Sequence, residues 1–194
     1  MTIHRIKKGG GLIFQIKKTT SIKSIFLINK ITTFDFYRTI VKINMQNTNH
    51  HFTIRVYGII INDQNEILLE KATYKDIEFV KFPGGGLQWG EGTIDALRRE
   101  LKEELNAEIA DIRHLYTTDF FQISAFDPNV QVISIYYLAQ MTNQDIFNQL
   151  PKSIPFDVTN QPVFFKYPLK NLTPATVTLP IDKYVVENFI LRLK

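Results

Sequence analysis

The chain has 194 residues, of which 44% are hydrophobic and 22% charged, with no cysteine and a formal net charge of +4. This length and composition suit one globular domain with a sizeable core, and they exclude the disordered and fibrous classes. The lack of cysteine excludes a disulfide scaffold, a thiolate metal site and a cysteine nucleophile, and it fits a reducing compartment. No apolar run approaches the roughly 20 residues of a membrane span, so we expect a cytoplasmic protein without a membrane contact.

The charge is unevenly distributed along the chain. Residues 1–44 hold nine Lys or Arg and one Asp, a net charge of +8, whereas residues 45–194 carry −4. A nucleic-acid interaction would depend on the first segment alone, and we do not expect one. We expect residues 1–44 to form a basic extension outside the core, with Met45 as the real or an alternative start. The other interpretation is a basic arm that adds strands or binds a polyanion.

Regular structure is predicted to begin soon after this extension. Residues 52–62 are β-branched and apolar, which is typical of a buried strand. A turn cluster at 62–65 leads into a hairpin partner at 66–70, and a polar loop is expected at 71–78. A short strand at 79–82 then ends where a proline and three glycines follow.

Glycine is concentrated in one short segment. Five of the six glycines that follow residue 44 lie between positions 84 and 92, which indicates a tight turn or a close approach to a ligand. A helix is predicted at about 94–105, with Thr93 as a plausible N-cap. Asn106 suits the left-handed position at the C-terminal end of that helix.

The remaining chain alternates strands and loops before a final helix. The predicted elements are a strand at 108–124, a turn at 127–129, a strand at 131–139, a polar loop at 140–162, a strand at 163–167 and a helix at 181–193. This order predicts a mixed α/β layer fold in a single domain at 45–194.

Three carboxylates share one narrow face of the helix predicted at 94–105. Glu100, Glu103 and Glu104 lie within one stripe when residues are placed about 100° apart. The adjoining stripe is apolar and should face the core; it comprises Ile94, Leu97, Leu101 and Leu105. Like charges at this spacing repel, but a hard divalent cation such as Mg²⁺ or Mn²⁺ would make the cluster favourable. The alternative is an ordinary solvated acidic face.

The wider pattern resembles the Nudix box, G-x5-E-x7-R-E-U-x-E-E-x-G-U, in which U is a bulky aliphatic residue. The box runs from Gly85 to Ala107, and the matching positions are Gly85, Glu91, Arg99, Glu100, Leu101, Glu103 and Glu104. Asn106 and Ala107 depart from the pattern at its end, but neither change removes a carboxylate. The resemblance covers about residues 52–193.

The resemblance implies a Nudix-type α/β/α sandwich with a mixed β-sheet between helices. It implies a hydrolase in which water attacks a phosphorus of a nucleoside diphosphate linked to another moiety, assisted by Mg²⁺ or Mn²⁺. By position, Glu100, Glu103 and Glu104 become the metal ligands, with the Gly85 carbonyl as a further one. Glu100 is our choice of general base, and Arg99 is expected to pair with a neighbouring carboxylate such as Glu91.

Four residues outside these roles are candidates for substrate binding. Arg55 interrupts an apolar strand and could meet a phosphate, or it could form a cross-strand ion pair. Trp89 could stack on a base or ribose, or it could cover the loop. Alternation along the strand would place one of Phe120 and Phe121 in the core and the other at a pocket.

Two other functions stay open from the sequence. A Nudix fold can act as a non-catalytic sensor or regulator that binds a nucleotide metabolite, although the complete set of carboxylates argues against it. The basic extension could instead belong to an enzyme that processes nucleic-acid ends. The identity of the nucleoside diphosphate derivative is undetermined, and a homodimer is compatible with the resemblance.

Overall fold

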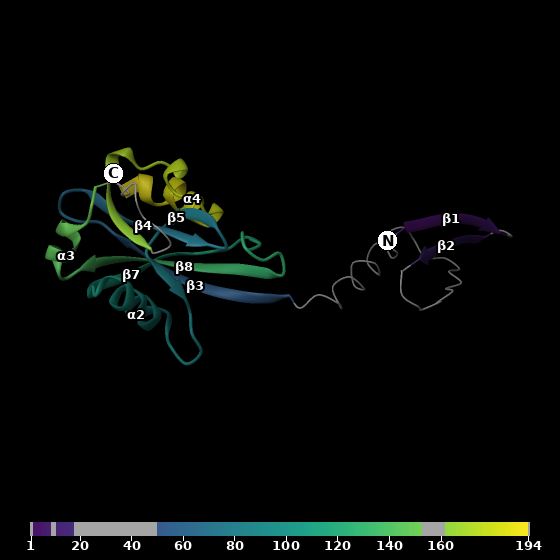
Figure 1. Ribbon diagram of the computed structural model, residues 1–194, viewed down its shortest axis with the longest axis horizontal. Helices are drawn as coiled ribbons and strands as arrows, with labels where there is room; N and C mark the ends of the chain where they lie inside the picture. The colour runs from purple at the N-terminus through teal and green to yellow at the C-terminus, as the bar shows by residue number, and fades with distance from the viewer. Residues whose placement is uncertain (1, 9–10, 18–49, 153–161, 194) are drawn as a thin grey trace. The chain divides into compact units, whose positions relative to one another are not determined.

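The computed structural model describes residues 2–8, 11–17, 50–152 and 162–193 (Figure 1). The chain divides into two compact units, Met1–Asn49 and His50–Lys194. In the described part of the first unit, β1 (Thr2–Lys8) and β2 (Gly11–Lys17) form an antiparallel pair. Met45, expected as a start, lies outside the described residues.

The described residues of the second unit form strands, three α-helices and several 3₁₀ turns. The strands are β3 (His51–Ile60), β4 (Glu66–Tyr74), β5 (Ile77–Lys81), β6 (Gly84–Gly86), β7 (Ile109–Thr117), β8 (Val130–Met141) and β9 (Val163–Pro168). The helices are α2 (Thr93–Leu105), α3 (Gln144–Gln149) and α4 (Pro180–Asn188), and the 3₁₀ turns are Leu169–Asn171, Pro174–Thr176 and Ile190–Leu193. Within the described part of the chain, no helix is long and apolar enough to cross a membrane.

The strands of the second unit divide into two sheets. One sheet has the order β6-β3-β8-β7 and the other has the order β5-β4-β9. The β3–β8 pair is parallel, whereas the other pairs are antiparallel. The predicted mixed α/β architecture is therefore confirmed, with the strands shared between two sheets.

Separate apolar clusters cover the two faces of the four-stranded sheet, because side chains alternate along a strand. On β3, Tyr57 and Ile59 belong to the cluster that includes α4, whereas Val56 and Ile60 belong to the cluster that includes α2. Figure 1 shows α2 and α4 on opposite sides of this sheet. Burial of one such side chain contributes about 1.5–3 kcal/mol, so α2 is held firmly beside β6.

The prediction of a polar loop at 71–78 is wrong, because β4 and β5 extend through this segment and form a hairpin. Tyr74 pairs with Ile77, and the two residues between them, Lys75 and Asp76, have φ angles of 49° and 63°. Two-residue hairpin turns with positive φ usually contain Asn-Gly or Asp-Gly. Lys-Asp lacks that signal, so the sequence pattern did not indicate the turn.

Three later boundaries also differ from the sequence predictions. β7 ends at Thr117, seven residues before the predicted end at 124. Just beyond this end, Asp119 accepts a 2.5 Å hydrogen bond from the Tyr116 hydroxyl. The loop expected at 140–162 contains α3, a helix too short to show clear periodicity. The final helix expected at 181–193 leaves α-helical geometry at Phe189, whose φ is −122°.

The two ends of α2 compare differently with prediction. Gly92 and not Thr93 is the N-cap; Thr93 is the first helical residue, and its hydroxyl lies 2.6 Å from that of Tyr137. The predicted inward position of Ile94 is also wrong, since its side chain is 39% exposed. At the other end, Asn106 adopts the predicted left-handed conformation, with φ 52° and ψ 29°.

We predict that Asn106→Ala lowers the free energy of unfolding by about 1 kcal/mol, because a Cβ-bearing residue without a polar side chain is strained in this conformation. Asn106→Gly should keep the wild-type stability or exceed it, since glycine adopts positive φ freely. Urea denaturation of the three proteins measures the difference. Equal stabilities for the Ala and Gly variants would contradict the prediction.

Candidate active site

The glycine strand β6 presents two of its carbonyl groups away from β3. Gly85 lies opposite Val56, and backbone hydrogen bonds two residues to either side continue the same antiparallel ladder. Hydrogen bonding alternates along such a ladder, so the Gly85 N–H and C=O point towards β3. The carbonyls of Gly84 and Gly86 therefore point away from β3 and are available to other groups.

Close neighbours exclude side chains at the first two positions of this strand. A Cβ atom on Gly84, whose φ is +131°, would lie 2.2 Å from the carbonyl oxygen of Val56. A Cβ atom on Gly85 would lie 2.3 Å from the carboxyl group of Glu100. The close approach indicated by the glycine cluster is therefore present, and it brings α2 directly against β6.

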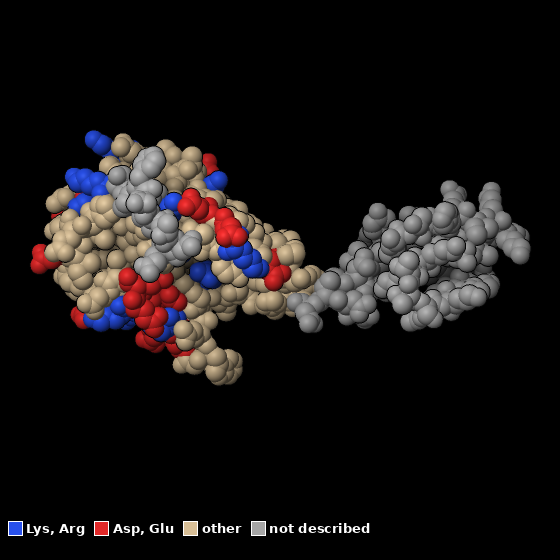
Figure 2. Space-filling view, viewed as in Figure 1, with Lys and Arg blue, Asp and Glu red and all other residues tan. Residues whose placement is uncertain are grey.

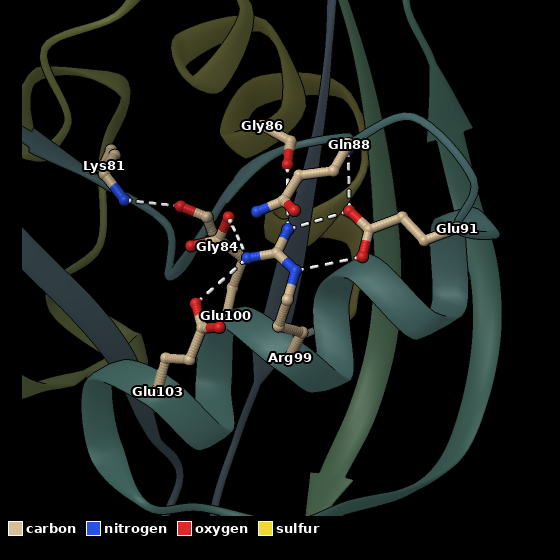
Figure 3. Close-up of polar contacts among 8 residues, drawn as sticks. All are labelled: Lys81, Gly84, Gly86, Gln88, Glu91, Arg99, Glu100 and Glu103. Carbon is tan, nitrogen blue, oxygen red and sulfur yellow. Dashed lines mark hydrogen bonds and ion pairs between the residues drawn. The ribbon is translucent and has the colours of Figure 1, made fainter.

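Arg99 connects this strand to three carboxylates (Figure 3). Its Nε and one terminal nitrogen donate to both carboxylate oxygens of Glu91, at 3.0 and 2.8 Å. The other terminal nitrogen donates to Glu100 at 3.0 Å and to Glu103 at 3.1 Å. The terminal nitrogen that donates to Glu91, Nη2, also donates to the Gly86 carbonyl at 3.1 Å. The Arg99–Glu91 pair expected from the sequence is thus part of a larger network.

The loop between β6 and α2 is held by Glu91. Arg99, followed by the backbone N–H of Gln88 at 2.7 Å, holds the pKa of Glu91 below its ordinary value. Trp89 lies in the same loop and is fully exposed. Glu91 therefore fixes the backbone of a loop whose Trp89 side chain projects into solvent.

Negative charge accumulates beside this network. Acidic side chains gather over α2 on the face seen in Figure 2. Loss of solvent around the carboxyl group, with Glu70 and Glu100 nearby, raises the pKa of Glu104 to about 7 although its side chain is exposed overall. Burial likewise raises the pKa of Glu70, against the opposing effect of Lys81. This part of the molecule is short of positive charge.

The donor groups suit a hard divalent cation. Among the described residues, no three His, Cys, Asp or Glu side chains already converge as a metal site. Glu100, Glu103 and Glu104 nevertheless offer only oxygen ligands, which is the chemistry that Mg²⁺ and Mn²⁺ prefer. Loss of solvent, followed by the nearby charges of Glu70 and Glu100, raises the pKa of Glu104, and a bound cation would oppose this by favouring the charged carboxylate.

A cavity of about 510 Å³ lies next to this network. Its lining includes charged and aromatic side chains, among them Arg55, Tyr74, Phe79, Lys81, Phe126 and Asp182. Arg55 lies opposite Gly86 in the β3–β6 register, and its Nε donates to the Tyr57 hydroxyl at 2.6 Å. Burial lowers the pKa of Arg55, but Tyr57, Glu100 and Glu70 outweigh that effect and keep it above its ordinary value.

Asp182 contributes a buried carboxyl group to the cavity. The side chain is 1% exposed, and its Oδ1 accepts a 2.5 Å hydrogen bond from the Tyr136 hydroxyl. Its Oδ2 has no hydrogen-bond partner among the described residues. Burial raises the pKa of Asp182 to about 7, against the opposing effect of Tyr136. The Phe82 backbone N–H also opposes this increase, so the fold itself partly stabilises the Asp182 carboxylate.

The substrate-binding residues suggested by the sequence lie in different places. Arg55 lines the cavity, whereas Trp89, Phe120 and Phe121 are not among its lining residues. Phe120 packs edge-on against Tyr184, with ring centroids 5.2 Å apart. Phe120 and Phe121 are both exposed, so the expectation that one of them lies in the core is wrong, because β7 ends at Thr117 and strand alternation does not extend to them. Roles for these three aromatic residues in binding stay predictions.

Sequence reasoning missed three buried charged residues near the site: Glu70, Lys81 and Asp182. A signal was present for Lys81, a lone cation in the short apolar strand expected at 79–82. Asp182 similarly lies in the first turn of α4, next to apolar Ile181. A charged residue inside an apolar run deserves a functional or ion-pair explanation, because charge is rarely buried without one.

Comparison with known proteins identifies the family. The family model described as NUDIX domain matches residues 51–156. The chain belongs to the Nudix family. Nudix proteins generally use divalent metal ions, and the carboxylate face of α2 agrees with that property. A search of curated proteins found no match.

Solved structures of Nudix proteins share the fold. A Nudix hydrolase from Nitrosomonas europaea is 16% identical over 73% of this chain and 90% of its own, with a TM-score of 0.54. A MutT Nudix hydrolase from Burkholderia pseudomallei is 17% identical over 72% and 99%, with a TM-score of 0.51. A MutT protein from Methanosarcina mazei Go1 is 18% identical over 75% and 97%, with a TM-score of 0.50. At these identities the likeness shows the fold alone.

We predict that Glu104 makes the stability of the metal-free protein depend on pH. Its folded pKa of about 7 exceeds the ordinary 4.5, so wild-type stability falls as pH rises between these values. Glu104→Gln has no such loss, and its thermal midpoint relative to wild type should rise between about pH 4.5 and about pH 8.

Thermal unfolding in the presence of a chelator measures this difference. Glu108→Gln is the matched control, because Glu108 is an exposed carboxylate just beyond α2. If the thermal midpoints of Glu104→Gln and wild type differ by the same amount at about pH 4.5 and about pH 8, the prediction is contradicted.

Proposed function

We propose that this Nudix protein is a divalent-metal-dependent hydrolase that cleaves the pyrophosphate linkage of a nucleoside diphosphate joined to another moiety. One observation carries the proposal: Arg99 gathers carboxylates against the glycine strand, and Arg55 on the neighbouring strand β3 lines the cavity. A cation-binding face therefore adjoins a space for a substrate. This is the arrangement that hydrolysis of a phosphoanhydride requires.

Glu100, Glu103 and Glu104 would hold Mg²⁺, with Mn²⁺ as a substitute. When bound, the ion neutralises phosphate charge and lowers the pKa of a water molecule. The sequence suggested the Gly85 carbonyl as a further ligand. The strand register favours the Gly84 carbonyl for that role, since the Gly85 carbonyl points towards β3.

Arg55 is the proposed phosphate contact inside the cavity. Among the described residues, its hydrogen bonding is limited to the donation from Nε to Tyr57. The terminal nitrogens therefore keep their donors for phosphate oxygens, which a planar guanidinium can bind in pairs. Glu100 accepts the proton of the attacking water at the carboxylate oxygen that Arg99 leaves free.

The nucleoside is proposed to occupy the cavity. Its volume of about 510 Å³ is in the usual range for sites that bind small molecules. Phe126 lies 5.0 Å from Tyr74 and 5.2 Å from Phe79 between ring centroids, which forms an aromatic wall for a base. The carboxyl group of Asp182, which is part of the cavity lining, would accept a hydrogen bond from an N–H of that base.

We predict that Glu103→Gln and Glu104→Gln each lower metal-dependent hydrolysis by at least about 100-fold, because each removes a charged metal ligand. Both variants should stay folded, since these side chains are exposed. The assay is formation of nucleoside monophosphate from a panel of nucleoside diphosphate derivatives, with and without Mg²⁺. Glu108→Gln should retain wild-type activity.

Two outcomes of this assay would count against the proposal. Near-full activity in both variants would refute the assignment of the metal ligands. Binding of a nucleotide without turnover of any member of the panel would favour the non-catalytic sensor. The complete set of carboxylates on α2 argues for turnover.

We predict that Asp182→Asn changes the ranking of substrates by their bases, because it replaces an acceptor with an amide. The ratio of kcat/KM between the best and the next base should shift about tenfold, mainly through KM. Asn retains an oxygen that can accept from Tyr136, so the fold should persist. An equal proportional loss for every base would show that Asp182 does not contact the base.

A further inference from the structure

Both carbonyls that point away from β3 are held by cations. Arg99 donates to the Gly86 carbonyl from α2, and Lys81 donates to the Gly84 carbonyl at 2.8 Å from β5 (Figure 3). Gly85 lies between these two anchor points. Arg99 belongs to the motif shared with the family, whereas Lys81 lies outside it and has no role in the proposed function.

Lys81 is fixed in turn by Glu70. The two residues lie opposite each other in the β4–β5 register and form an ion pair. Lys81 is 5% exposed and Glu70 is 1% exposed. This buried pair belongs to the three-stranded sheet, but the ammonium group reaches β6 in the other sheet. It therefore connects the glycine strand to a second, independent layer of the fold.

Stability alone is a poor explanation for this pair. The desolvation of two charges often exceeds their attraction, so apolar residues of similar size serve a core equally well or better. Gly84 has a φ of +131°, a conformation that glycine itself does not enforce. A buried donor at its carbonyl does restrict that backbone, and Glu100 packs against the next residue.

We propose that Lys81, oriented by Glu70, is a positioning residue for the cation site: it fixes the Gly84 carbonyl and with it the backbone on which Glu100 rests. The consequence for catalysis depends on the proposed function. The consequence for cation binding can be measured separately from catalysis.

The test must separate position from charge. Glu70 and Lys81 both affect the electrostatic environment of Glu104, so removing only one of them would change two properties together. Glu70→Gln/Lys81→Met leaves the net charge unchanged, leaves no buried charge unpaired and removes the donor to Gly84. Any effect of this double variant on cation binding then reports the lost hydrogen bond.

The chain offers a matched control on the same strand. Glu66 and Lys166 are also buried, and Lys166 Nζ lies 4.0 Å from the Glu66 carboxylate. Lys166 Nζ also donates a 2.6 Å hydrogen bond to the Asn148 carbonyl. Glu66 lies four residues before Glu70 on β4, about 13 Å along the strand. Glu66→Gln/Lys166→Met thus removes a second buried Glu and Lys, together with a lysine donor to a backbone carbonyl, away from the site.

The measurement is the dissociation constant for Mn²⁺ in the full-length protein, followed by the electron paramagnetic resonance signal of the free ion. Loss of the Lys81 donor should weaken Mn²⁺ binding about tenfold or more, as for other groups that orient metal ligands. The control pair should leave the constant unchanged, and thermal unfolding should show similar stabilities for the two double variants. Half-activation of hydrolysis by metal should follow the binding constants.

Unchanged or tighter Mn²⁺ binding in Glu70→Gln/Lys81→Met would overturn the inference and leave the proposed function intact. Wild-type protein that binds no Mn²⁺ would refute both. If the double variant folds poorly, Lys81→Met is compared with Lys81→Arg; loss of the positive charge alone would favour Mn²⁺ binding, so weaker binding in Lys81→Met reports the lost donor. Arg keeps the charge and the donors, so weaker binding in Lys81→Arg than in Lys81→Met would also overturn the inference.

Discussion

The mutual repulsion of carboxylates on α2 is the constraint on which the rest of the site depends. Glu100 and Glu103 share one stripe of the helix, and Glu91 is brought against it by the preceding loop. Arg99 offsets this charge with hydrogen bonds to all three carboxylates. Because the guanidinium is planar and presents its donors in fixed directions, it also sets where each carboxylate lies. The same side chain donates to the Gly86 carbonyl, so Arg99 both offsets the charge of the carboxylates and positions the glycine strand.

Close packing of backbone against carboxyl group is the second constraint. Any side chain at Gly85 would enter the space of Glu100, so α2 and β6 can approach only at glycine. The apolar cluster that includes Leu97 and Leu101 holds the helix at this distance. Lys81 reaches the strand from the other sheet. The glycine strand is thereby restrained by groups from α2, β3 and β5, which lets short polar contacts persist at an edge strand.

The helix was predictable because its spacing is local, whereas the buried ion pair depends on a distant register. Residues three and four apart always share a helical face, so Glu100 and Glu103 could be placed together from sequence. Glu70 and Lys81 meet only because the hairpin turns at Lys75 and Asp76, and that turn lacks the usual residues. Asp182 meets Tyr136 across 46 positions of the chain, a contact that no periodic pattern encodes.

The net charge of this unit is a poor guide to what it binds, because its positive and negative side chains are unevenly distributed around the site. Residues 45–194 carry −4, yet Arg55 and Lys81 line the cavity beside the carboxylates of α2. An anionic substrate would be repelled by the carboxylates alone. Under the proposed function, a divalent cation held by those carboxylates would offset much of their charge, and the substrate would meet Arg55 on the side of the cavity. Binding of the anion would then depend on the cation, and Arg55 in the cavity lining would supply the attraction that needs no metal.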